Sequence, residues 1–304
     1  MTEQHIDLKY FPHFDVINRS VVLIAPTLLI QIHIMPELPE VETVKRGIAT
    51  HIENKIIQQV SVRERRLRWE VPEQLAIILP GQRVETVTRR GKYLLLKCTL
   101  GHLLIHLGMS GRLLVVNPEV PLKKHDHVDF IFDHQQCLRY HDPRRFGCIL
   151  WTTEPVEQHP LLVNLGIEPL ENHALGDYLF HLARKKDIAV KKFIMDNHIV
   201  VGVGNIYANE SLFSAGIHPL RPVSSINLAE FQQLGTLIQQ ILTTAIAQGG
   251  TTLKDFTNSE GHAGYFQQEL KIYGRVGEAC HCGEIIQHVK IAQRASYFCP
   301  RCQL

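Results

Sequence analysis

The segment Met35-Pro36-Glu37-Leu38-Pro39-Glu40-Val41-Glu42-Thr43 opens the regularly patterned part of the chain. From here, apolar residues recur at the spacing of a helix with one buried face, at Val41, Val44 and Ile48. Prolines and acidic residues come first and basic residues follow, an order that suits the helix dipole. The sequence therefore predicts an amphipathic helix that begins close to Met35 and ends at Gly47.

Outward from this helix, residues 56–151 alternate short apolar runs with turn residues, a pattern typical of strands. The clearest runs are at residues 93–97, 103–107, 128–132, 137–140 and 148–151. Several short strands at this spacing predict a β-sandwich behind the leading helix.

After Pro169 the pattern changes to helices, which are predicted at residues 177–186, 190–197, 206–215 and 228–248. Two short strands are predicted in the tail, at residues 265–273 and 297–299. The fold class is therefore α+β. We expect a sandwich domain over residues 35–165, a helical domain over 166–260 and a terminal module over 265–304.

Residues 1–34 share little with the rest of the chain. Their apolar run has the length of a signal-peptide core, but Pro26 and Gln31 interrupt it and no small-residue cleavage pattern follows. We therefore expect that this extension is not a targeting signal. We expect instead that the mature protein lacks it and that translation begins at Met35.

The composition is ordinary for a folded protein: 304 residues, 45% hydrophobic, 20% charged and a formal net charge of +2. No uninterrupted apolar stretch reaches the roughly 18 residues that a spanning helix needs, which argues against an integral membrane protein. Because the chain is not basic overall, a nucleic-acid surface has to come from local clusters of Lys and Arg. Four of the seven cysteines lie near the C-terminus, which favours a metal site in a reducing cytoplasm over a disulfide framework.

The tail carries the pairs Cys280-x-Cys282 and Cys299-x-x-Cys302, and four thiolates on two turns suit tetrahedral zinc. The first spacer is one residue shorter than usual, and His281 can substitute for one of the cysteines. The alternative is a hairpin that holds free thiols without metal. Arg294 stands near the tip of this hairpin, where a guanidinium can bind a phosphate.

The turn Val201-Gly202-Val203-Gly204-Asn205 lies between two predicted helices, and its backbone N–H groups suit an anion at the start of the second helix. Lys191 and Lys192 are close in sequence, so a DNA phosphate fits this turn better than a mononucleotide. The alternative is a helix-capping loop.

Two further turns present apolar residues between polar ones. Residues 142–147 expose adjacent arginines and Phe146, as a device inserted into a base stack requires, and Met109 stands between two glycines. Core packing is the alternative for each of them. The basic cluster Arg89, Arg90 and Lys92 is typical of a solvated face.

Taken together, the segment 35–43, the glycine turn ending at Asn205 and the terminal cysteines resemble the formamidopyrimidine-DNA glycosylase family. The resemblance runs from Met35 to the C-terminus. It implies a bifunctional DNA glycosylase and AP lyase of base excision repair, with a β-sandwich, a helix–two-turn–helix domain and a zinc-finger hairpin. It also implies one structural zinc ion and, as partner, duplex DNA that contains oxidised purines such as 8-oxoguanine and formamidopyrimidines. We further expect a cytoplasmic monomer that does not associate with membranes.

The resemblance also assigns roles to single residues. The catalytic set that it implies is Pro36, Glu37, Lys92 and Arg294. The residues that it places on DNA or beside the extruded base are Asn205, His125, Arg144, Met109, Phe146, Lys254 and Glu210. The zinc ligands that it implies are Cys280, Cys282, Cys299 and Cys302.

The chemistry of such an enzyme limits where its nucleophile can stand. An amine can attack C1′ of the sugar, expel the base and leave an iminium ion that acidifies neighbouring C–H bonds for β- and then δ-elimination. Pro36 supplies this amine only as the first residue, because inside a chain its nitrogen is a tertiary amide. Glu37, beside it, is placed to move protons at the sugar ring oxygen and the leaving base.

Three other functions compete with this one. A glycosylase of the endonuclease VIII group, for oxidised pyrimidines, is disfavoured because that group usually has glycine where this chain has Leu38. A protein that binds lesions without cutting follows if residues 1–34 are retained and Pro36 is blocked. A zinc-dependent hydrolase needs an open coordination position, which four thiolates do not leave.

Overall fold

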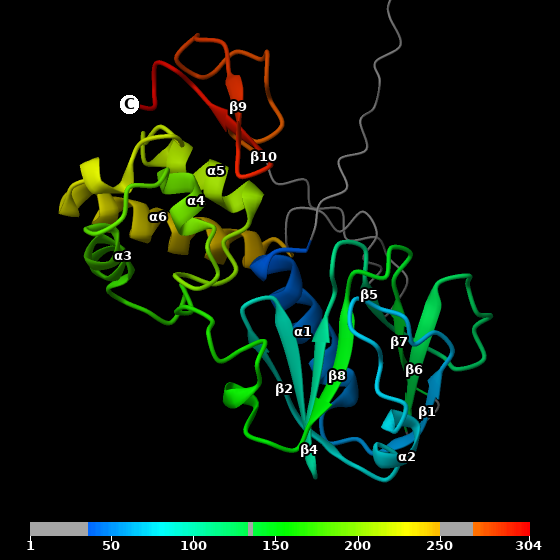
Figure 1. Cartoon of the computed structure of the whole chain (residues 1–304). Coiled ribbons are helices and arrows are strands. Elements are labelled where there is room, and N and C mark those ends of the chain that lie inside the picture. Colours follow the sequence, from blue (N-terminus) through cyan, green and yellow to red (C-terminus); the bar gives the residue numbers. More distant parts are fainter. Residues whose placement is uncertain (1–35, 133–135, 250–269) are drawn as a thin grey trace, which may run out of the picture. The chain divides into compact units, whose positions relative to one another are not determined.

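The structure, a computed structural model, describes residues 36–132, 136–249 and 270–304, which lie in one unit, His33–Leu304. Its leading helix, α1, spans Leu38–Ile52 (Figure 1). The helix continues past Gly47, where we predicted its end, because Ile48, the last residue of the predicted stripe, and Ile52 both lie beyond Gly47 and are buried. A buried apolar stripe of this kind outweighs the low helix propensity of a single glycine.

Two four-stranded antiparallel sheets follow, which confirms the predicted β-sandwich, although three of their strands, at Ile57–Val62, Val84–Arg90 and Arg112–Val116, were not among the predicted runs. One has the order β1-β6-β7-β5, and its strands are Ile57–Val62, Asp126–Phe132, Cys137–His141 and Arg112–Val116. The other has the order β2-β3-β4-β8, and its strands are Val84–Arg90, Tyr93–Cys98, Gly101–His106 and Cys148–Thr152. Buried side chains of both sheets and of α1 share one core, to which the short helix α2, Leu75–Ile78, contributes Leu75.

The helical part has its own core. Its helices are α3, Leu175–Ala183; α4, Val190–Ile194; α5, Asn205–Ser214; and α6, Leu228–Ala247. Two 3-10 turns, Val156–Gln158 and Val223–Ser225, lie in the connections. Helix α6 begins at a capping box, in which the Asn227 side chain accepts a hydrogen bond from the Glu230 amide. None of the described helices is long and apolar enough to cross a membrane.

The terminal hairpin consists of β9, Gln287–Ile291, and β10, Arg294–Phe298. Ala292 and Gln293 between them both have positive φ, as a two-residue hairpin turn requires. The strand predicted at 297–299 is thus the end of β10, and β9 was missed. The strand predicted at 265–273 is not formed over residues 270–273, and its other residues lie outside the described part of the chain.

Candidate active site and nucleic-acid interface

Glu37 stands at the start of α1 and is almost fully buried, with 4% of its surface exposed. Its Oε1 accepts a hydrogen bond from the Ile206 amide at 3.3 Å. The start of α5, where we expected a DNA phosphate, therefore binds the carboxyl group of Glu37. Gly204 makes this approach possible, because a Cβ at that position would lie 1.9 Å from the Glu37 carboxyl carbon. Gly202, with φ of 80°, likewise leaves room for Leu38. The glycine turn at residues 201–205 therefore packs against Glu37 and Leu38, at the start of α1.

The proton affinity of Glu37 is unusual. Burial raises its pKa to about 7, and the charge of nearby Lys92 only partly opposes the rise. Its Oε2 has no hydrogen-bond partner among the described residues. A carboxyl group with such a pKa can both give and take a proton at neutral pH, which suits general acid–base chemistry.

The backbone beside Glu37 is fixed by Glu40. One carboxylate oxygen of Glu40 accepts from the Glu37 amide at 2.9 Å, and the other accepts from the Tyr207 hydroxyl at 2.8 Å. Pro36, which precedes Glu37, is half-buried. The position of the Pro36–Glu37 peptide is thus set by α1 and α5 together.

Lys92 reaches this site from the turn between β2 and β3. Burial lowers its pKa, while the carboxyl of Glu37 raises it and the guanidinium of Arg294 lowers it further. These mutual effects place Glu37, Lys92 and Arg294 in one electrostatic neighbourhood, although they come from a helix, a sheet and the terminal hairpin. Arg294 itself is exposed at the first position of β10.

Glu168 fixes the turn that carries Lys92 by hydrogen bonds. This buried carboxylate accepts hydrogen bonds from Arg89 at 2.9 Å, from Arg90 at 3.1 Å and from the Gly91 amide at 2.6 Å. Arg89 also binds Glu42 of α1 at 3.1 Å. The expectation of a solvated basic face is therefore wrong for Arg89, whose side chain is 7% exposed.

Lys191 links the helices to the hairpin. Its Nζ donates to Asn205 Oδ1 at 2.7 Å, to the Ala295 carbonyl at 2.8 Å and to Ser296 Oγ at 2.7 Å. Three oxygen acceptors match the three N–H bonds of an ammonium group, although burial lowers the pKa of Lys191 to about 7. Through this side chain α4 positions both Asn205 and the strand that begins at Arg294.

Two turns of the sandwich, at residues 108–111 and 142–147, are interlocked. Asp142 binds both of them: its Oδ1 accepts from Ser110 Oγ at 2.6 Å, and its Oδ2 accepts from the Gly147 amide at 3.0 Å. The backbones of the two turns are also in close contact at Gly108. A side chain at this position would clash, because a Cβ on Gly108 would lie 2.4 Å from the Phe146 carbonyl carbon. The turn with Met109 and the turn with Phe146 thus form one body.

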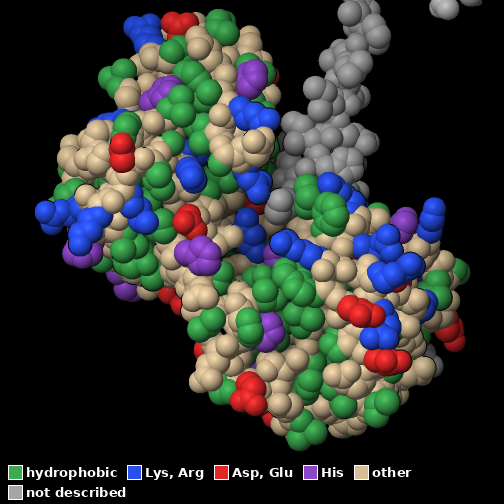
Figure 2. Space-filling model, viewed as in Figure 1, with side chains coloured by type: hydrophobic (Ala, Val, Ile, Leu, Met, Phe, Trp, Pro, Cys, Tyr) green, Lys and Arg blue, Asp and Glu red, His purple; other side chains and the backbone are tan. Residues whose placement is uncertain are grey.

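The side chains that these turns present differ in exposure. Phe146 is 45% exposed and lies against the Arg144 guanidinium, 4.8 Å from its ring centroid, whereas Met109 is half-buried. Basic side chains are visible on the face drawn in Figure 2. An exposed aromatic ring with a cation stacked on it suits contact with unstacked bases.

His125 is half-buried just before β6, in a group of three imidazoles. Its ring meets those of His127 and His141 edge-on, with centroids 6.2 and 6.0 Å away, and His141 is hydrogen-bonded to Asp126 at 2.7 Å. Burial and the neighbouring His141 lower the pKa of His125.

Of the two other residues expected at the DNA or beside the extruded base, the structure describes only Glu210. The carboxylate of Glu210, on α5, accepts from the backbone amides of Lys271, Ile272 and Tyr273 at 2.9, 3.0 and 2.9 Å. It therefore anchors this segment inside the protein. Lys254 lies outside the described residues.

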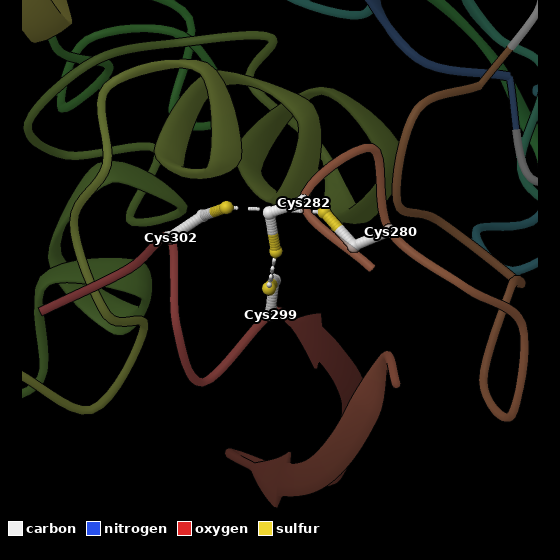
Figure 3. A group of neighbouring side chains, drawn as sticks. All are labelled: Cys280, Cys282, Cys299 and Cys302. Carbon is white, nitrogen blue, oxygen red and sulfur yellow. Dashed lines mark hydrogen bonds between the residues drawn. The ribbon is translucent and has the colours of Figure 1, made fainter. Parts of the chain in front are cut away.

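The four terminal cysteines form the zinc site. Their sulfur atoms lie within 4.8 Å of one another (Figure 3), with 3.9 Å between Cys280 and Cys302 and 3.5 Å between Cys282 and Cys299. Sulfurs around a tetrahedral zinc, with Zn–S of about 2.3 Å, stand about 3.8 Å apart. The donor set thus fits one zinc ion, and the short Cys280-x-Cys282 spacer does not prevent it.

Sequence reasoning missed several residues that the structure brings to the site. His106 stood in the Met109 turn but was not singled out; its Nδ1 accepts from the Gly108 amide at 2.9 Å, and burial, with Lys92, lowers its pKa to about 4. Glu40, three residues after Glu37, had the capping-box spacing as a signal. Asp142 begins the turn that was quoted for Phe146. Glu168 had no local signal, because its partners lie far away in sequence.

Comparison with known proteins agrees with this geometry over the whole described part. Three family models match: "Formamidopyrimidine-DNA glycosylase N-terminal domain" at residues 35–149, "Formamidopyrimidine-DNA glycosylase H2TH domain" at 165–257, and "Zinc finger found in FPG and IleRS" at 280–304. The formamidopyrimidine-DNA glycosylase of Methylococcus capsulatus is 57% identical over 270 residues, which are 88% of this chain and 100% of that protein. That of Pseudomonas aeruginosa is 54% identical with the same coverage.

Solved structures of the Lactococcus lactis enzyme are also similar. A complex of one of its point mutants with DNA containing Fapy-dG has a TM-score of 0.81 and 33% identity, covering 88% of this chain and 99% of that one. A complex with DNA containing an abasic site has a TM-score of 0.81 and 34% identity, with the same coverage. This chain belongs to the formamidopyrimidine-DNA glycosylase family and is a DNA glycosylase of base excision repair with AP lyase activity.

Proposed function

We propose that this enzyme excises oxidised purines from duplex DNA with the nitrogen of Pro36 as its nucleophile, in a form that begins at Pro36. The observation that carries the proposal is Glu37, a buried carboxyl group with a pKa of about 7 directly beside Pro36. The match to the family begins at residue 35, and 270 residues of this chain cover the full length of its relatives. The Fapy-dG in a similar complex supports a ring-opened purine as substrate.

The proposed steps follow from these groups. The Pro36 amine adds to C1′ as the C1′–N bond to the base breaks, and the base leaves with that electron pair and takes up the proton that the Pro36 nitrogen loses. Glu37 donates its proton at the sugar ring oxygen, so that the sugar opens to an iminium ion. Loss of a proton from C2′ then expels the 3′ phosphate, and a second elimination expels the 5′ phosphate. Lys92 and Arg294 hold these phosphates by charge.

The DNA contacts are proposed on the same basis. Asn205 and His125 bind phosphates, while Met109, Arg144 and Phe146 fill the space that the flipped nucleotide vacates. We assign Glu210 to anchoring residues 271–273, because its carboxylate already accepts three hydrogen bonds there. The zinc ion stabilises the hairpin that presents Arg294, since its four thiolates leave no position for water or substrate.

We also propose the domain limits 35–165, 166–260 and 265–304, with residues 1–34 absent from the mature enzyme. A monomer fits a two-stranded substrate that one chain contacts from three modules. The cytoplasm, where bacterial DNA lies, is the proposed location.

Borohydride trapping tests the proposal. A chain that begins at Pro36 should form a covalent adduct with DNA containing 8-oxoguanine or an abasic site, because reduction fixes the iminium. The chain that begins at Met1 should bind this DNA but form no adduct. A Pro36→Gly chain that begins at residue 36 still has a free N-terminal amine, primary instead of secondary, and should retain part of the trapping.

The intact mass of each protein has to be measured beside the trapping. Efficient trapping by a protein whose mass still includes residues 1–34 would contradict the role of Pro36. Binding without an adduct in both chains would instead indicate a protein that recognises lesions without cutting.

A further inference from the structure

The zinc site contains a fifth side chain that the four-cysteine description leaves out. His281 stands between Cys280 and Cys282, and its Nδ1 lies 3.4 Å from the Cys280 sulfur. Its Nε2 lies 3.9 Å from the sulfur of Cys302, which comes from the other end of the hairpin. The imidazole thus turns the edge that carries both of its nitrogens toward two of the four sulfurs.

The orientation of this ring is set by α5. Phe213, which is 8% exposed, meets the His281 ring edge-on with centroids 5.8 Å apart. Phe213 belongs to the small core that also contains Cys280 and Cys299. The outer side of His281 is exposed to solvent, so the ring covers the site without being buried in it.

This placement does not suit a metal ligand. An imidazole ligand points the lone pair of one nitrogen at the metal, whereas here two nitrogens face two different sulfurs. The four sulfurs already meet the tetrahedral requirement. A ring between two sulfurs instead has a thiolate acceptor within reach whichever nitrogen carries the proton.

We infer that His281 donates its one N–H to a zinc-bound thiolate, that of Cys280 or that of Cys302 according to which nitrogen carries the proton, and that it stabilises the bound metal without coordinating it. Four thiolates on Zn²⁺ leave a net charge of −2, which N–H donors disperse. Backbone amides of Cys282 and Glu284 already donate to the sulfurs of Cys280 and Cys282. The one-residue spacer brings the side chain at position 281 over the site and lets it add a donor that also reaches Cys302.

The test measures zinc retention in the full-length protein. Zinc release to an excess of a coloured chelator should be about tenfold faster or more in His281→Ala than in the wild type, as is typical when a group that hydrogen-bonds to a ligand is removed. His281→Asn keeps an N–H donor and should recover part of the difference. His288→Ala is the matched control, because His288 is an exposed histidine of the same hairpin.

Cobalt substitution separates donation from coordination. The visible bands of the Co²⁺-loaded wild type should be those of four sulfur ligands, and they should be the same in His281→Ala. Equal zinc release from wild type, His281→Ala and His288→Ala would overturn the inference. A shift of the cobalt bands in His281→Ala would also overturn it, because His281 would then be a ligand.

Discussion

At the scale of single residues, Glu37 has to hold a proton that a surface carboxyl group would lose. Between pH 4.5 and about 7 the folded protein keeps this proton while the unfolded chain has released it. The free energy of unfolding therefore falls as the pH rises through this window, and the loss persists above it. Glu37, the proton donor that we propose, is thus a source of instability at neutral and alkaline pH.

Replacing Glu37 by Gln should remove this pH dependence along with activity. Relative to the wild type, Glu37→Gln should gain about 2 kcal/mol in the free energy of unfolding when the pH is raised from 5.5 to 8, since each pKa unit is worth about 1.4 kcal/mol. Urea unfolding at the two pH values measures the gain, and a lesion-cleavage assay measures the lost activity. Glu171→Gln, which removes an exposed carboxylate, serves as control. An equal stability difference at both pH values would show that Glu37 is ionised in the folded protein.

The sequence could identify Glu37 but not its proton affinity. The residues 35–43 resemble a family whose motif names the glutamate, so its place was predictable. Its pKa depends on burial against a turn that is distant in the sequence. Gly204 in this turn has no side chain, which leaves room for the carboxyl group. We interpreted the same glycines as a binding site for a DNA phosphate, because the local sequence does not show which acidic group lies at the start of a helix.

At the scale of elements, the orientation of the terminal hairpin depends on Lys191 of α4. Lys191→Met should remove the donor that Asn205, Ala295 and Ser296 share; of these residues Ser296 is fully buried, and an unpaired buried group costs about 1–3 kcal/mol. DNA affinity should fall as well, because Asn205 and Arg294 lose their common support. Fluorescence anisotropy with lesion DNA and thermal unfolding measure the two effects.

The neighbouring Lys192 provides the control, because it is exposed on the same short helix. Lys192→Met should change stability by no more than about 0.5 kcal/mol. If both variants lost the same DNA affinity, Lys191 would act only through its charge, and its hydrogen bonds would be incidental to the hairpin.

Most elements were predictable because their own residues determine them. Strands β3, β4, β6, β7 and β8 each contain an apolar run that is buried in the core, so the local pattern and the structure agree. The segment 270–273 is the opposite case. Its backbone amides bind the carboxylate of Glu210 instead of a neighbouring strand, and no feature of the segment itself indicates that partner.

At the scale of the whole molecule, Glu168 joins the sheet turn of Lys92 to the connection that leads into the helices. Glu168→Gln should leave Arg89 and Arg90 without their shared carboxylate; the Arg89–Glu168 pair is buried, and breaking such a pair typically costs about 3–5 kcal/mol. Because the Gly91 amide also loses its charged acceptor, Lys92 should be less well placed and strand cleavage should slow.

Denaturant unfolding and single-turnover cleavage measure these effects, again with the exposed Glu171→Gln as control. The slowing should persist at saturating DNA, since Lys92 belongs to the proposed catalytic set. If only the DNA concentration needed for half-maximal rate changed, Glu168 would serve binding alone.

Asp142 has a consequence for the kinetics of base extrusion. Because one carboxylate and a glycine contact tie the Met109 turn to the Phe146 turn, the two side chains that we propose to fill the vacated space should enter a duplex together. Stopped-flow fluorescence of 2-aminopurine placed next to the lesion should therefore show a single insertion phase. Asp142→Ala should divide it into two phases with different rates, whereas two phases in the wild type would show that the turns act separately.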